Sequence, residues 1–156
     1  MTTPPLATPY IKAPLMRRFM AMIYDTLLLA AVSMGYAALF LGIGKVLLPQ
    51  VENITDNIGF QLGWLIVLVS FFCFFWRRGG QTLGMRAWRL HIVDEHGRAP
   101  SLKACLLRCV YAPISFALLG LGYWWALFDN DKRCLHDTLT RTRILLLPKK
   151  PKTSTA

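Results

Sequence analysis

Residues 17–48 have the sequence RRFMAMIYDTLLLAAVSMGYAALFLGIGKVLL, and this stretch decides the fold. Between residues 19 and 44 the only ionisable side chain, apart from those of two tyrosines, belongs to Asp25. A helix needs about 20 apolar residues to cross a bilayer core of about 30 Å. We therefore predict a transmembrane helix over about residues 17–47. A cleavable signal peptide has a much shorter apolar region and is not favoured here.

Asp25 is the unusual residue of this predicted helix. A carboxylate at that depth costs about 2.5–3.5 kcal/mol on insertion scales, so it is expected to be functional or paired. At about 100° per residue, the seven steps from Arg18 bring Asp25 back to within about 20° of the same face, about 10 Å along the axis. Two interpretations follow. Asp25 is either an ion or proton site with Arg18 as its electrostatic partner, or a structural residue that fixes helix packing.

The rest of the chain divides around a second apolar stretch. Residues 59–76, GFQLGWLIVLVSFFCFFW, predict a second transmembrane helix. Residues 1–14 hold four of the nine prolines and are expected to form a disordered arm. We predict one membrane domain over residues 15–147 and a basic, disordered tail over residues 148–156.

A third apolar stretch, residues 109–128, has two possible placements. Basic clusters occupy residues 12–18, 77–108 and 132–152, whereas the loop 49–58 is acidic and contains no basic residue. Because cytoplasmic loops carry the excess of Lys and Arg, all three clusters are expected in the cytoplasm. A single third crossing would place the basic tail outside. A re-entrant or interfacial segment, bent near Pro113, avoids this, but a third transmembrane helix remains the alternative.

The basic cluster after the second span contains signals for a small cytoplasmic cap. Residues 88–93 predict a strand, residues 94–97 a turn, and residues 143–147 a second strand that pairs with the first as a ribbon. Ser101 is a plausible N-cap for the following helix. The predicted fold class is thus an all-α polytopic membrane protein, with two full transmembrane helices, a third helical segment and this cap.

Composition excludes several function classes. Hydrophobic residues make up 54% of the chain, and its net charge is +10. Because the basic residues flank apolar runs, the expected partner is the anionic headgroup surface of the bilayer and not nucleic acid. Residues 79–84, GGQTLG, lack the Gly-Lys-Ser/Thr ending of a phosphate loop, so a turn with Thr82 capping the next one is favoured. Cys134 and His136 offer at most two metal ligands. We expect no metal, no cofactor and no enzyme activity.

Three motifs in order resemble those of the RDD family of membrane proteins. Residues 18–25, RFMAMIYD, resemble its opening. Residues 80–90, GQTLGMRAWRL, are similar to its G-x-T-x-G stretch, and residues 135–142, LHDTLTRT, to its closing element. The resemblance covers about residues 14–147. Many members carry a lysine where this chain has Met85, so any role of that lysine falls to Arg86 or is absent.

The resemblance implies which residues form the site. Arg18, Asp25 and Asp137 take the places of the arginine and two aspartates that give the family its name. The expected supporting residues are Gln81, Thr82, Gly84, Arg86 and His136. The implied function is ion or proton-coupled transport through a homo-oligomer or with a membrane-protein partner, in a bacterial inner membrane. The alternative is a non-transporting scaffold or assembly subunit, in which the Arg-Asp-Asp set is a structural polar cluster.

Overall fold

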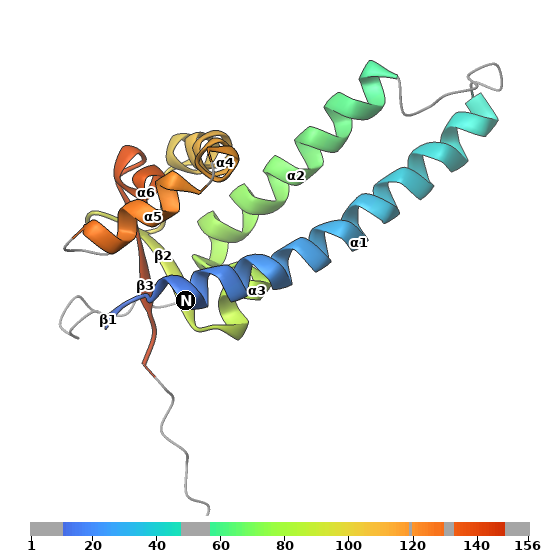
Figure 1. Cartoon of the computed structure of the whole chain (residues 1–156). Coiled ribbons are helices and arrows are strands. Elements are labelled where there is room, and N and C mark those ends of the chain that lie inside the picture. The colour runs from blue at the N-terminus through green and yellow to red at the C-terminus, as the bar shows by residue number, and fades with distance from the viewer. Residues whose placement is uncertain (1–10, 48–56, 119, 130–132, 149–156) are drawn as a thin grey trace, which may run out of the picture.

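The computed structural model describes residues 11–47, 57–118, 120–129 and 133–148. Two long helices extend side by side away from a compact cap of short helices and strands (Figure 1). The elements, in chain order, are β1 (Ile11–Lys12), α1 (Leu15–Leu47), α2 (Ile58–Gly79), α3 (Leu83–Ala87), β2 (Leu90–Asp94), α4 (Leu102–Ala117), α5 (Leu121–Phe128), α6 (Leu135–Leu139) and β3 (Thr142–Leu146).

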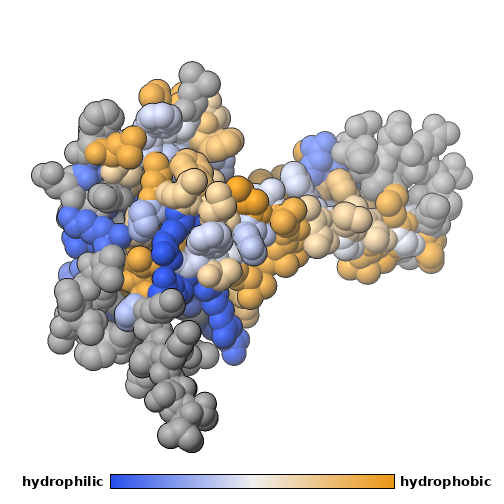
Figure 2. Space-filling model, turned by 60° about the horizontal axis from the view of Figure 1, so that its bottom comes forward, coloured by the Kyte–Doolittle hydropathy of each residue, from blue (hydrophilic) through white to orange (hydrophobic). Residues whose placement is uncertain are grey.

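The two predicted spans are confirmed as helices long and apolar enough to cross a membrane. They are Leu15–Gly44 within α1 and Ile58–Gly79, the whole of α2. Only 6% of the most apolar window of each is buried inside the chain, which leaves their side chains to face lipid. Figure 2 shows the projecting part as largely hydrophobic, with hydrophilic residues gathered over the cap. The acidic loop lies almost wholly outside the described residues.

Local sequence sets the ends of α2 and its contact with α1. The Asn57 side chain accepts hydrogen bonds from the backbone N–H groups of Gly59 and Phe60, and so caps the first turn. Gly80 ends the helix in a left-handed conformation at φ 62°, which glycine adopts without strain. Farther from the cap, the Tyr36 hydroxyl donates to the backbone oxygen of Phe60 at 3.0 Å, tying α1 to α2.

The predicted ribbon is confirmed and has a third strand. β2 and β3 pair antiparallel, with Ile92 opposite Ile144. β1 adds to the other edge of β3, with Ile11 opposite Leu146, so the order is β1-β3-β2. Ile11 and Lys12 therefore differ from the irregular arm expected through residue 14, because β3 offers them an open edge. The predicted Ser101 N-cap is also confirmed, since its hydroxyl accepts from the backbone N–H of Ala104.

The sheet decides how the third apolar segment is placed. β2 precedes α4 and α5, β3 follows them, and the two strands are hydrogen-bonded to each other. Both strands must lie on one side of a bilayer, so α4 and α5 together cannot cross it once. The two helices meet at 91°, in agreement with the re-entrant or interfacial alternative. The bend was expected near Pro113, but Pro113 lies inside α4 and the break falls between Ala117 and Leu121.

The cap contains two copies of one local structure, 52 residues apart. In each copy a five-residue helix, α3 or α6, is followed by an arginine with positive φ and then a strand. The arginines are Arg89, with φ 57°, and Arg141, with φ 51°. Because the pairing of Ile92 with Ile144 has the same offset, 144 − 92 = 52, the copies are related by a local twofold. Both five-residue helices contribute residues that contact α1.

Candidate functional site: a buried charged cluster and a cavity

Asp137 is the centre of a buried charged cluster. One oxygen of its fully buried carboxylate accepts from Arg18 Nη1 at 2.6 Å and from the backbone N–H of Cys134 at 3.1 Å. The other oxygen accepts from Arg108 Nη1. Burial alone raises the pKa of this carboxyl, but the two guanidiniums outweigh burial and hold that pKa well below its usual range. Asp137 therefore stays ionised and joins α1, α4 and α6.

Asp25 lies in a second polar contact, between α1 and α3. One of its oxygens accepts from the backbone N–H of Gly84 at 2.9 Å, and the other accepts from the Thr82 hydroxyl at 2.5 Å. The same hydroxyl accepts from the backbone N–H of Met85 at 3.2 Å, so Thr82 caps α3 as predicted. Asp25 is 7% exposed. The carboxylate thus fastens the start of α3 to the first membrane helix.

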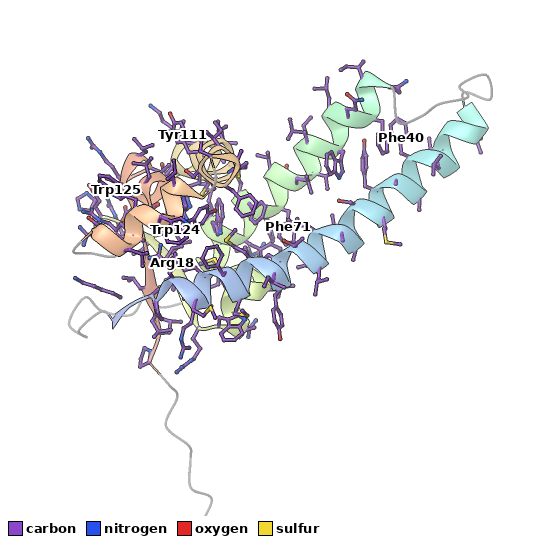
Figure 3. The ribbon with its side chains drawn as sticks, viewed as in Figure 1. Arg18, Phe40, Phe71, Tyr111, Trp124 and Trp125 are labelled. Carbon is purple, nitrogen blue, oxygen red and sulfur yellow. The ribbon has the colours of Figure 1, made fainter. Side chains whose placement is uncertain are left out.

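The predicted partnership of Arg18 with Asp25 is not the one in the structure. Arg18 Nη1 donates to Asp137 and to the sulfur of Cys134 at 3.3 Å. Figure 3 shows Arg18 near the start of α1, on the side toward the cap. The reason is distance, because about 10 Å along the axis separates two residues seven positions apart in a helix. Cap groups instead lie within hydrogen-bond distance of each side chain, Cys134 and Asp137 for Arg18 and Thr82 and Gly84 for Asp25. Arg18, Asp25 and Asp137 therefore take part in two separate contacts, and α1 contributes a residue to each of them.

The supporting residues have unequal roles. Thr82 and Gly84 bind Asp25 directly, while Gln81 donates to the backbone oxygen of Leu90 at 2.6 Å and so holds the start of β2. Arg86 is exposed, and the structure does not bring it to the charged cluster. His136 is buried against the ring of Tyr123, at 4.8 Å between ring centroids, with its Nε2 3.6 Å from Asp137.

Arg108 is the residue that the sequence reasoning missed. The sequence placed it on the predicted helix after Ser101 as one of the basic residues of the cytoplasmic side, whereas its side chain is 4% exposed and binds both Asp137 and the Thr142 hydroxyl. A signal was available. Within residues 104–118, ACLLRCVYAPISFAL, Arg108 is the only charged side chain, just as Asp25 is within residues 19–44. A lone charge in an apolar helix indicates a buried partner elsewhere.

The geometry of Cys134, His136 and Asp137 does not suit a metal ion. One ligand atom from each lies within 4.8 Å of the others, and all three side chains are buried. However, the guanidiniums of Arg18 and Arg108 already contact both carboxylate oxygens, where they repel a cation. Burial raises the pKa of the Cys134 thiol to about 11, so the sulfur is held as a neutral thiol. Cys134, His136 and Asp137 are therefore better described as part of the charged cluster than as metal ligands.

A cavity of about 480 Å³ lies against both polar contacts. Its walls come from α1, α2 and α4, and it ends at residues of the cap. The polar lining residues include Arg18, Asp25, Thr82, Arg108 and His136. The volume falls within the range of about 300–1,000 Å³ found for small-molecule sites. Most of the other lining residues are apolar, among them Leu65, Leu68, Val69, Phe72 and Phe116.

These features define a class of protein: a small integral membrane protein with two spanning helices, a sheet-containing cap and a buried cluster of arginine and aspartate. The model of the RDD family matches residues 12–141, and the chain belongs to that family. An uncharacterised protein of Rickettsia prowazekii (strain Madrid E), RP437, is 29% identical over 82 residues. That match covers 52% of this chain and 45% of the relative, so it spans less than half of the relative's length. No solved structure is significantly similar to the chain.

His136 gives the charged cluster a defined response to acid. Burial lowers the pKa of His136 from 6.5 to about 4 in the folded chain. The unfolded state therefore takes up a proton at higher pH than the folded state, and stability falls as the pH drops from about 6.5 towards 4. Between pH 7 and pH 5 we expect His136 to account for a loss of about 2 kcal/mol.

The measurement is the free energy of unfolding in a mild detergent at the two pH values. Asp137 stays ionised at both, because its pKa in the folded chain is lowered. The variant His136→Gln should lose most of this pH dependence, whereas His96→Gln, at an exposed turn residue, should keep it. An equal pH dependence in the wild type and His136→Gln would rule out this explanation.

Proposed function

We propose that this chain is a non-transporting membrane module, an assembly or scaffold subunit whose polar residues fix a cap onto two transmembrane helices. The sequence left a scaffold as the alternative to transport, and the arrangement of the side chains favours the scaffold. The first membrane helix carries both attachment points, Arg18 to α6 and Asp25 to α3. A partner would then meet a rigid cap held in one orientation on the membrane. No catalytic role is proposed.

A single observation carries the proposal: every oxygen of both buried carboxylates accepts a hydrogen bond from the protein. For Asp25 the donors are Thr82 and Gly84. For Asp137 they are Arg18, Arg108 and the backbone of Cys134. A carboxylate that carries protons or ions must exchange these partners with water in each cycle. Saturation by fixed donors is typical of structural anchors.

Ion or proton-coupled transport is the second candidate, favoured by one observation. Asp25 and Arg18 line the cavity between the helices, and Asp25 is an ionisable residue within the membrane span. Intramembrane carboxylates commonly mark ion or proton pathways. A pathway through two spanning helices would need several copies of the chain to enclose it. The expected partners are accordingly further copies or another membrane protein.

Asp25→Asn distinguishes the two functions. The asparagine keeps an acceptor for the Gly84 N–H, and the Thr82 hydroxyl can turn to accept instead of donate. We expect a stability loss of about 1 kcal/mol, the worth of one hydrogen bond. In liposomes with an imposed pH or sodium gradient, the wild type should show no flux above that of empty vesicles.

Thr82→Val is the matched control, because it removes the donor to Asp25 but leaves the titratable carboxyl in place. If Asp25 is structural, both variants lose stability and neither changes flux. If the wild type shows pH-dependent flux that Asp25→Asn abolishes and Thr82→Val retains, with both variants folded, transport replaces the scaffold proposal.

We also propose that the cap faces the cytoplasm of a bacterial inner membrane. The basic clusters flank the sheet, where they meet anionic lipid headgroups, and nucleic acid is not an expected partner. A reporter active only in the cytoplasm should work when fused after Ala156 and fail when inserted in the acidic loop 49–58. The opposite pattern would invert the orientation. Activity on the same side at both positions would contradict two crossings by α1 and α2.

A further inference from the structure

Within the part of the chain that the structure describes, three buried polar atoms on cavity-lining residues of α2, α4 and α6 have no hydrogen-bond partner. They are Nε1 of Trp76, Nε of Arg108 and Nδ1 of His136. The three side chains are 8%, 4% and 3% exposed, and they come from α2, α4 and α6. Buried polar groups in folded proteins are nearly always hydrogen-bonded, so three exceptions around one cavity need an explanation. A ligand that supplies the missing partners explains all three.

The chemistry of these atoms defines the head of the ligand. Trp76 Nε1 and Arg108 Nε can only donate, so the ligand must offer acceptor atoms. The Arg108 guanidinium lies over the Trp76 ring, with its Cζ 5.3 Å from the ring centroid, so the two donor side chains are neighbours. The Arg108 guanidinium carries a positive charge, and the oxygens of Asp25, the carboxylate that lines the cavity, are already bound by Thr82 and Gly84. An oxyanion is the acceptor that matches these groups.

The remaining wall defines the rest of the ligand. Leu65, Leu68, Val69 and Phe72 of α2 line one side of the cavity, and Phe116 of α4 lines another. Leu65 is 54% exposed and Phe116 is 61% exposed, so the lining residues reach the lipid-facing surface. A molecule can therefore enter from the bilayer with an apolar chain along α2 and its head at the cap.

We propose that the cavity binds an amphiphile with an oxyanion head, a carboxylate or phosphate, and an apolar chain. The head accepts hydrogen bonds from Trp76 Nε1 and Arg108 Nε, and the chain lies between α1, α2 and α4. The proposed head site uses Trp76 and Arg108 as donors and does not depend on Asp25 carrying an ion. It stands whether the chain is a scaffold or a transporter.

The experiment measures binding to the purified full-length chain in a non-ionic detergent by native mass spectrometry. The probes are oleate, dioleoyl phosphatidylglycerol, oleyl alcohol and inorganic phosphate. Oleate or the phospholipid should bind with one-to-one stoichiometry, at least tenfold more tightly than oleyl alcohol or phosphate, which each lack one part of the ligand. The stronger of the two identifies a free acid or a membrane lipid as the source. Equal binding of oleate and oleyl alcohol would overturn the proposal.

Two variant pairs test the place of binding. Trp76→Phe removes one donor and should weaken oleate or lipid binding about tenfold, as expected for a hydrogen bond to a charged group. Trp88→Phe is its control, since Trp88 Nε1 is also buried with no partner among the described residues, but Trp88 does not line the cavity. Equal affinities of Trp76→Phe and the wild type would remove the proposed head site.

Ala112→Phe fills the cavity from α4, whereas Ala117→Phe adds the same group to an exposed position on the same helix. Binding should be lost in the first and retained in the second. Both variants should elute as folded protein, because the added ring in the first occupies empty volume. Retained binding in Ala112→Phe would place the amphiphile outside the cavity and overturn the proposal.

Discussion

Replacing Asp137 with asparagine should destabilise the folded chain by about 3–5 kcal/mol, the cost of breaking a buried charge pair from one side. Arg18 and Arg108, which are 5% and 4% exposed, would be left buried with no carboxylate between them. The asparagine can accept from only one of them, because its amide nitrogen is a donor and would face the other guanidinium. The free energy of unfolding in mild detergent measures the effect.

As a control, Asp94→Asn removes a carboxylate from a solvated site. Asp94 pairs with Arg98, whose side chain is 71% exposed, and such pairs contribute about 1 kcal/mol or less. Adding Arg108→Met to Asp137→Asn should restore part of the loss, because it removes a buried guanidinium that has lost its carboxylate and keeps most of the volume of that side chain. If Asp137→Asn costs no more than Asp94→Asn, the cluster does not hold the cap in place.

Sequence alone predicted the elements of this fold well because each has a local cause. The two spans follow from unbroken apolar length, the Ser101 cap from one hydroxyl, and the pairing of the strands near Ile92 and Ile144 from their apolar, turn-bounded character. The two-residue β1 was not predicted, because a strand that short has no pattern of its own. It exists because β3 has a free edge.

The partners within the site could not be predicted in the same way. Arg18 and Asp137 are 119 positions apart, and their contact depends on how α6 packs against α1. The helical-face argument compared Arg18 with Asp25 only, because both lie in one predictable element. It correctly placed the two on related faces of α1. It could not show that the cap supplies each with a closer partner, or that Arg108 completes the cluster.

Gly84 should tolerate no side chain, because α3 packs tightly against α1 at this residue. A Cβ there would fall against the backbone oxygen of Ala21 and 2.8 Å from the Asp25 carboxyl group. A backbone oxygen in a continuous helix cannot turn aside, so α3 must move and the Thr82 and Gly84 hydrogen bonds to Asp25 lengthen. We expect Gly84→Ala to cost about 3 kcal/mol, at the upper end for overpacking.

Gly42→Ala is the matched control for Gly84→Ala, since a Cβ at Gly42 meets nothing within 4 Å. It should be neutral or stabilising by up to about 1 kcal/mol, the helix preference of alanine over glycine. Adding Asp25→Ala to Gly84→Ala should recover only part of the loss, because the Ala21 oxygen remains in the way. Full recovery would show that the carboxylate alone sets the spacing. Equal stability of Gly84→Ala and Gly42→Ala would show that α3 does not rest on α1, and Asp25 would then be free to exchange its partners, as a transport site requires.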